Sequence, residues 1–179
     1  MMNHNIFIIT GGQGKGKTTF LLELSKLLKN AGLPIAGFCA PGYWKEGKRS
    51  GFDLMEINGV KQVCLCNTTC DAGDIPFRRF FFKHSALSYG NQLLVSAAGT
   101  NNIVFIDEIG PLEMEGNAWA NGLNQLVQNP PLALVVAVRS NLLAEIAGKW
   151  GMNADVVFDI ERNTPSEVFD KLNELFNHD

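Results

Sequence analysis

The sequence has no excess of positive charge, because 18 acidic residues outnumber 15 lysines and arginines and give a net charge of −3. Proteins that bind nucleic acid broadly show a basic surface, so this balance argues against that class. No apolar stretch reaches the roughly 20 residues that a membrane-spanning helix needs. The N-terminus also lacks the charged and apolar regions of a signal peptide. We therefore expect a cytoplasmic protein that binds neither nucleic acid nor membrane.

Cysteine is scarce, with four residues in 179, and in the cytoplasm we expect all four to be reduced. Cys64, Cys66 and Cys70 form a C-x-C-x₃-C pattern, and Cys39 or His84 could supply a fourth zinc ligand. Structural zinc sites usually pair their cysteines as C-x₂₋₄-C. The first two cysteines instead fall on one face of an expected strand, where small thiols pack well. We favour packing, with zinc as the alternative.

The most informative stretch lies near the N-terminus. Residues 6–10 are an apolar run typical of a buried strand. Residues 11–18, GGQGKGKT, then match the Walker A pattern G-x-x-x-x-G-K-[ST] in full. A helical pattern of apolar residues follows over 17–30. A strand, a glycine-rich loop and a helix in this order predict a phosphate-binding loop.

The chemistry of a triphosphate explains these residue types. Glycines let backbone N–H groups point inward at the phosphates, and the helix N-terminus favours anions. Lys17 is expected to reach the β- and γ-phosphates, Thr18 to ligate Mg²⁺, and Thr19 to add a phosphate contact. Lys15 is expected either to act as a lid or to point into solvent. The expected nucleotide-binding residues are Gly11, Gly12, Gln13, Gly14, Lys15, Gly16, Lys17, Thr18 and Thr19.

A second acidic motif completes the expected site. The apolar run 103–106 ends at Asp107 and Glu108, which is the pattern of a Walker B strand. Asp107 is expected to hold Mg²⁺ opposite Thr18. Glu108 follows at the strand end, where a carboxylate can accept a hydrogen bond from a water molecule and aim it at the γ-phosphate. Lys17 and Glu108 are therefore the expected catalytic residues.

Strands that alternate with helices predict a largely parallel α/β sheet within one domain, residues 1–179. We expect a three-layer P-loop sandwich, acting as a monomer, whose sheet is extended by an antiparallel meander over residues 35–66. Residues 42–49 are expected as a hairpin tip, residues 67–76 as a loop, and Ser85 as a helix N-cap. Residues 77–82 give no clear prediction. Strands are expected at 6–10, 34–41, 50–57, 60–66, 103–106, 132–138 and 155–158, and helices at 17–30, 85–98, 117–128, 141–150 and from 164 onward.

Three stretches together resemble the thermostable nucleoside-triphosphatase family: GGQGKGKTT, the run Arg49-Ser50-Gly51-Phe52, and IVFIDEIGPLE. The resemblance covers nearly the whole chain but not residues 63–82. It implies a compact P-loop fold and slow, Mg²⁺-dependent hydrolysis of several nucleoside triphosphates to diphosphates. It also implies that residues 11–18 and 103–110 contact the nucleotide.

Several other side chains have two open interpretations. Arg139, after the apolar run 132–138, is either a phosphate contact or a solvated loop residue. Arg49 is expected to be structural or close to the substrate, and Arg78 and Arg79 are the remaining candidates for phosphate contacts. The aromatic pair 43–44 could stack on a base or cover the edge of the sheet, and we favour the edge.

The main hypothesis is Mg²⁺-dependent hydrolysis of ATP, GTP and other nucleoside triphosphates to the diphosphate and phosphate. One alternative is a small-molecule kinase on the same fold, although such enzymes usually carry an arginine-lined lid and this chain has only five arginines. The other is a binding module in which slow hydrolysis acts as a timer.

Overall fold

The computed structural model describes residues 5–59, 61–152 and 156–175, and all its strands belong to one ten-stranded sheet. Five adjacent strands run parallel in the order β10-β1-β9-β8-β2. Parallel strands need crossover connections, which are usually helices that cover the sheet. The sequence of this part of the chain therefore alternates between strands and helices. The parallel strands are β1 (Ile6–Gly11), β2 (Ile35–Cys39), β8 (Ile103–Ile109), β9 (Ala133–Arg139) and β10 (Val157–Asp159).

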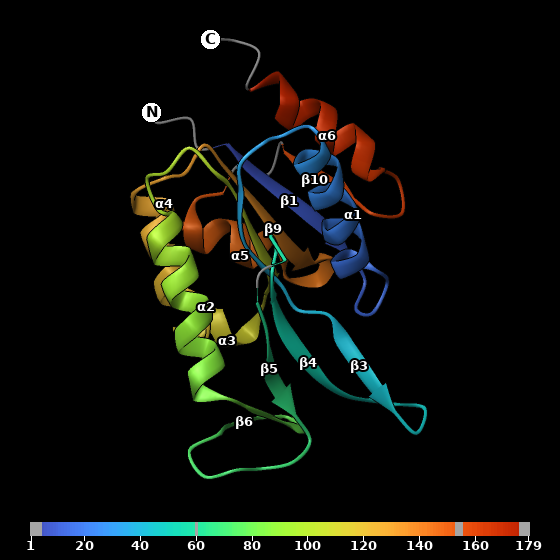
Figure 1. The fold of residues 1–179 in the computed structure, drawn as a ribbon, viewed down its shortest axis with the longest axis vertical. Helices are drawn as coiled ribbons and strands as arrows, with labels where there is room; N and C mark the ends of the chain where they lie inside the picture. Colours follow the sequence, from blue (N-terminus) through green and yellow to red (C-terminus); the bar gives the residue numbers. More distant parts are fainter. Residues whose placement is uncertain (1–4, 60, 153–155, 176–179) are drawn as a thin grey trace.

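Helices cover both faces of the parallel strands, which confirms the expected three-layer α/β architecture (Figure 1). Helices α1 (Lys17–Asn30) and α6 (Pro165–Glu174) lie on one face. The other face carries α2 (His84–Ala97), α4 (Ala120–Gln128) and α5 (Leu143–Trp150), with the short α3 (Pro111–Met114) and the 3₁₀ turn η1 (Ser140–Leu142) nearby. No helix in the described ranges is long and apolar enough to cross a bilayer.

Alternate residues of each parallel strand supply two separate cores. In β1, Ile6 and Ile8 face the core beneath α2, α4 and α5, whereas Phe7 and Ile9 face the core beneath α1 and α6. Ile8 and Ile9 are completely buried. Because both faces of the strand are covered, its sequence is apolar throughout instead of alternating.

The antiparallel meander extends the sheet beyond the helices, as expected, and it forms the lower part of Figure 1. The hairpin predicted over residues 42–49 is confirmed, because β3 pairs with β4 across a tight turn at Glu46 and Gly47. Both turn residues have positive φ, 51° and 74°, as a two-residue hairpin turn requires. The meander strands are β3 (Gly42–Lys45), β4 (Lys48–Glu56), β5 (Gln62–Asn67), β6 (Ile75–Phe77) and β7 (Phe80–Phe82).

Strands β6 and β7 form a hairpin in the stretch that gave no clear prediction, so the expected loop 67–76 ends earlier than predicted. Its turn is Arg78-Arg79, with Arg78 at φ 56°. Arginine is not a typical turn residue, so the sequence carried no turn signal here. Val60 and Asp155, the expected first residues of two strands, lie outside the described residues.

The prediction of Ser85 as a helix N-cap is wrong, because α2 begins at His84 and Lys83 is the cap residue. The backbone N–H of Lys83 donates to the Leu65 carbonyl at 2.9 Å, which ties the chain to β5 just before the helix. The Lys83 ammonium also pairs with Asp71 at 2.5 Å and Asp74 at 2.7 Å. These tertiary contacts fix the start of α2 without a side-chain cap.

Candidate active site

The glycine-rich loop joins β1 to α1 at the carboxyl edge of the sheet. Gly16 has φ 105°, a conformation that residues with a Cβ rarely adopt, and it immediately precedes the helix. The Lys17 side chain is buried, 4% exposed, and its Nζ donates to the carbonyl oxygens of Gly11 at 3.2 Å and Gly12 at 3.0 Å. The loop therefore holds its cation at the N-terminus of α1, a place that suits an anion.

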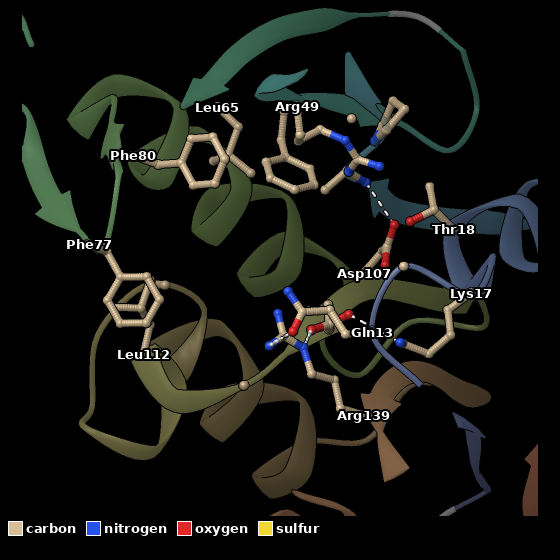
Figure 2. A pocket seen from close by; sticks show the side chains of 18 of the residues that line it. Gln13, Lys17, Thr18, Arg49, Leu65, Phe77, Phe80, Asp107, Leu112 and Arg139 are labelled. Atoms are coloured by element: carbon tan, nitrogen blue, oxygen red, sulfur yellow. Dashed lines mark hydrogen bonds and ion pairs between the residues drawn. The ribbon is translucent and has the colours of Figure 1, made fainter. Parts of the chain in front are cut away.

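Asp107 lies in β8 directly beside the start of α1. Its Oδ2 accepts a hydrogen bond from the Ala40 N–H at 3.0 Å, and its carboxylate also bonds to the Thr18 side chain. Burial raises the pKa of Asp107, and these hydrogen bonds act in the opposite direction. Figure 2 shows Thr18 next to Asp107, so two oxygen ligands of the kind that Mg²⁺ prefers lie together.

Glu108, the next residue, lies between two cations. Its Oε2 is 3.5 Å from Lys17 Nζ, and its Oε1 is 2.5 Å from Arg139 Nε. Arg139 also donates from its Nη1 to Gln13 Oε1 at 3.2 Å. Of the two interpretations of Arg139, the structure supports a position in the site, at the end of β9, over one in a solvated loop (Figure 2).

These side chains line a cavity of about 950 Å³ between the loop and the meander. The expected nucleotide residues Gln13, Gly14, Gly16, Lys17, Thr18 and Thr19 line it, together with Asp107, Glu108 and Arg139. Gly11, Gly12 and Lys15 do not line the cavity. The two glycines instead hold Lys17 through their carbonyls, and Lys15 is exposed, as one of its two interpretations proposed.

The meander and the segment after β8 contribute a wall that the sequence predicted only through its candidate arginines. Trp44, in the edge strand β3, is 62% exposed and lines the cavity, a position that favours the stacking interpretation over a cover for the sheet edge. Arg49, Arg78 and Arg79 line the same cavity. Only the fold brings them to the site, because they lie about 30 to 60 residues from the loop in sequence.

The cysteine pattern does not form a metal site. Among the residues that the structure describes, no three His, Cys, Asp or Glu side chains are grouped so that they could hold a metal ion. Cys66 is buried, Cys64 is partly buried and Cys70 is exposed. Burial raises the pKa of the Cys66 thiol to about 12, as expected for a packed, unreactive thiol. The described residues therefore favour packing over the zinc alternative for these cysteines.

Glu113 is a buried acid at the floor of the cavity, 3% exposed. Its Oε2 accepts a hydrogen bond from the Gly110 N–H at 2.7 Å, and its Oε1 accepts one from the Trp119 N–H at 3.3 Å. The carboxylate therefore links the start of α3 to the segment just before α4. Burial raises the pKa of Glu113 to about 7, against the opposing effect of these hydrogen bonds.

This raised pKa predicts a pH-dependent stability. Above the unfolded pKa of 4.5 the unfolded chain releases the Glu113 proton while the folded chain keeps it, so stability falls as pH rises to about 7. We expect a loss of about 3 kcal/mol of unfolding free energy from this group. Thermal unfolding of the wild type between pH 5 and 8 should show this slope, and Glu113→Gln should flatten it. Glu115→Gln, at an exposed neighbour, is the control, and an unchanged slope in Glu113→Gln would contradict the assignment.

Comparison with known proteins places this chain in one family. A family model described as NTPase matches residues 6–172. Nucleoside-triphosphatase THEP1 from Thermotoga petrophila is 34% identical over 167 residues, 89% of this chain and 86% of that protein. The cancer-related nucleoside-triphosphatase homolog of Mus musculus is 28% identical over 142 residues, 75% of this chain and 74% of that protein.

Solved structures agree on the fold. The solution structure of a human cancer-related nucleoside triphosphatase superimposes with a TM-score of 0.67 at 20% identity, over 97% of this chain and 96% of that one. The crystal structure of THEP1 from Aquifex aeolicus gives a TM-score of 0.64 at 20% identity, over 95% and 96%. Sequence and fold therefore lead to the same group of proteins, and this chain belongs to the nucleoside-triphosphatase family.

Proposed function

We propose that this nucleoside-triphosphatase hydrolyses nucleoside 5′-triphosphates, ATP and GTP among them, to the diphosphate and phosphate in a Mg²⁺-dependent reaction. The observation that carries the proposal is the position of Glu108, whose carboxylate lies between Lys17 and Arg139 in the cavity of the phosphate loop. A carboxylate beside two cations can orient water next to a phosphoryl group whose charge the cations stabilise.

Each side chain then has a definite task. The loop N–H groups and Lys17 bind the β- and γ-phosphates. Glu108 accepts a hydrogen bond from the attacking water and aims it at the γ-phosphorus. Arg139, which holds Glu108 in place at 2.5 Å, also adds positive charge beside the phosphoryl group in the transition state.

Mg²⁺ fits the oxygen ligands of this site. Thr18 and Asp107 would hold the ion, and few other protein ligands are needed because Mg²⁺ usually keeps water molecules and substrate phosphates. When bound, the ion would neutralise charge on the β- and γ-phosphates. The phosphate loop, residues 11–18, and the acidic pair Asp107-Glu108 are not expected to contact the base. This supports hydrolysis of several nucleotides and not of one alone.

Removal of Mg²⁺ should abolish phosphate release. We expect steady-state release from ATP, GTP, CTP and UTP in Mg²⁺, and a return to background when EDTA is in excess. Asp107→Asn should raise the Mg²⁺ concentration for half-maximal rate by about tenfold or more, since metal affinity depends on the charged ligand. The exposed Asp170→Asn in α6 is the matched control. Full activity in EDTA would contradict the role of the metal.

We also propose that the chain acts on this small substrate as a cytoplasmic monomer, without nucleic acid or membrane. The net charge of −3 supports the absence of a nucleic-acid partner.

A further inference from the structure

The cavity has two chemically different ends. The phosphate end is formed by the loop, Asp107, Glu108 and Arg139, as described above. The far end is apolar and aromatic, and Figure 2 shows it on the side opposite Lys17 and Thr18. We call it the aromatic end, and it is formed by Leu65, Phe77, Phe80, Phe82, Leu112 and Trp119.

A nucleotide held by the phosphate loop would turn its γ-phosphate toward Glu108 and so toward the aromatic end. In a phosphate loop the helix N-terminus receives the α- and β-phosphates and the lysine reaches the γ-phosphate. The γ-phosphate would therefore face Glu108, and the chain continues from Glu108 directly into residues 110–113, which line the cavity and include Leu112 of the aromatic end. The nucleoside of such a ligand would then extend away from Glu108, and its base would leave the aromatic end free.

The cavity is large enough to extend beyond the phosphate loop. Single-ligand sites usually enclose about 300–1,000 Å³. The cavity here, about 950 Å³, is at the upper limit of that range. A triphosphate at the phosphate end would leave the aromatic end available to another molecule.

Three arginines on the same wall indicate that this molecule is anionic. Among the described residues, Arg49, Arg78 and Arg79 form no ion pair, whereas Arg139 is paired with Glu108. Their guanidinium groups instead lie over aromatic rings, that of Arg79 at 4.9 Å from the Phe80 centroid and that of Arg78 at 5.4 Å from Phe77. Guanidinium groups that stack on rings keep their N–H fork for a carboxylate or phosphate.

Arg49 connects the two ends. Its guanidinium lies 4.6 Å from the Trp44 ring and packs on the backbone of Gly42. Gly42 is two residues after Ala40, whose N–H donates a hydrogen bond to Asp107. Its Nε is buried and has no hydrogen-bond partner in the described part of the chain. Leaving such a donor unsatisfied costs free energy, and a ligand oxygen would recover it.

We propose that the aromatic end binds a nucleoside 5′-monophosphate and that its phosphate accepts the γ-phosphoryl group of the nucleotide. The base would stack on the aromatic side chains, and the arginines would hold the phosphate next to Glu108. A phosphate oxygen of the acceptor bonds to the γ-phosphorus while the bond from that phosphorus to the β,γ-bridging oxygen breaks. The electron pair leaves with the donor diphosphate, so the products are two nucleoside diphosphates. This inference depends on the nucleotide site of the proposed function.

The test follows the γ-phosphoryl group itself. The full chain is incubated with Mg²⁺ and ATP labelled at the γ-phosphate, with and without AMP, GMP, CMP or UMP. We expect labelled diphosphate from at least one monophosphate, with a matching decrease in labelled inorganic phosphate. If no monophosphate is labelled while phosphate release without acceptor is normal, this proposal is overturned and hydrolysis stands. If phosphate release is absent as well, the proposed function fails together with it.

Two variants locate the acceptor. Arg79→Ala, at an exposed hairpin turn, and Phe80→Ala should each raise the half-saturating monophosphate concentration about tenfold or more. Phe80→Ala should leave phosphate release without acceptor within about twofold of wild type, because Phe80 belongs to the aromatic end. Arg162→Ala, an exposed arginine after β10, is the matched control. If both variants transfer the γ-phosphoryl group with the wild-type half-saturating monophosphate concentration, the acceptor binds elsewhere and the proposal is overturned.

Discussion

Replacing Glu108 with glutamine should lower phosphate release from ATP by about 10²–10⁴-fold while nucleotide binding is kept. The amide has nearly the same shape but is a weak proton acceptor, so it can no longer activate the attacking water. It also loses its charge between Lys17 and Arg139, 3.5 Å and 2.5 Å away. The two cations are then free for the phosphates, so the dissociation constant for ATP should stay the same or decrease.

Two measurements separate these effects. Steady-state phosphate release reports turnover, and titration calorimetry with ATP and Mg²⁺ reports binding. Glu115→Gln, an exposed glutamate just after α3, makes the same chemical change outside the cavity and should behave like wild type. Normal turnover in Glu108→Gln would show that another group orients the water.

Replacing Gly37 with alanine should destabilise the whole sheet. Gly37 has φ 90° in the middle of β2, and an added Cβ would collide with the Phe105 carbonyl oxygen and lie 2.8 Å from the Phe105 nitrogen on β8. Neither neighbour is a flexible side chain, so the two strands must separate. We expect a loss of about 3 kcal/mol or more of unfolding free energy, which corresponds to roughly 10 °C in Tm for a chain of this length.

The same variant should also impair the site, because β2 is followed directly by Ala40, whose N–H donates to Asp107. Thermal unfolding of Gly37→Ala and Gly148→Ala gives the matched comparison. Gly148 lies in α5 with open space around its Cα, so alanine there should stabilise by about 0.5–1 kcal/mol. Wild-type Tm in Gly37→Ala would contradict the close approach of β2 and β8.

The phosphate end could be predicted from the sequence because its residues lie in two short motifs. Residues 11–18 and Asp107-Glu108 each follow a buried strand, and parallel strands bring their carboxyl ends to one edge of a sheet. Arg139 follows an apolar run, so the sequence placed it at the same edge of the sheet. The sequence did not show which side chain it would contact, and two interpretations therefore stayed open. Its contact with Glu108 required the coordinates.

The aromatic end could not be predicted, because its residues come from separate strands and loops. Phe77 and Phe80 are brought to the cavity by a hairpin whose turn is Arg78-Arg79, and no glycine or asparagine marks that turn. The burial of Glu113 depends on the Trp119 N–H six residues later, a contact that no periodicity indicates. Local patterns predict local geometry, and this wall is formed only by tertiary contacts.

Phosphate release from Mg²⁺–ATP by the wild type and by Lys17→Ala tests the central claim most directly. Lys17 is the buried cation of the loop, 4% exposed, and its removal should lower the rate by about 10²-fold or more. Lys26→Ala, at an exposed position of the same helix, controls for loss of a lysine and should keep the wild-type rate. A rate lost in Lys17→Ala and kept in Lys26→Ala is the predicted result, whereas equal rates in all three proteins would contradict hydrolysis at this loop.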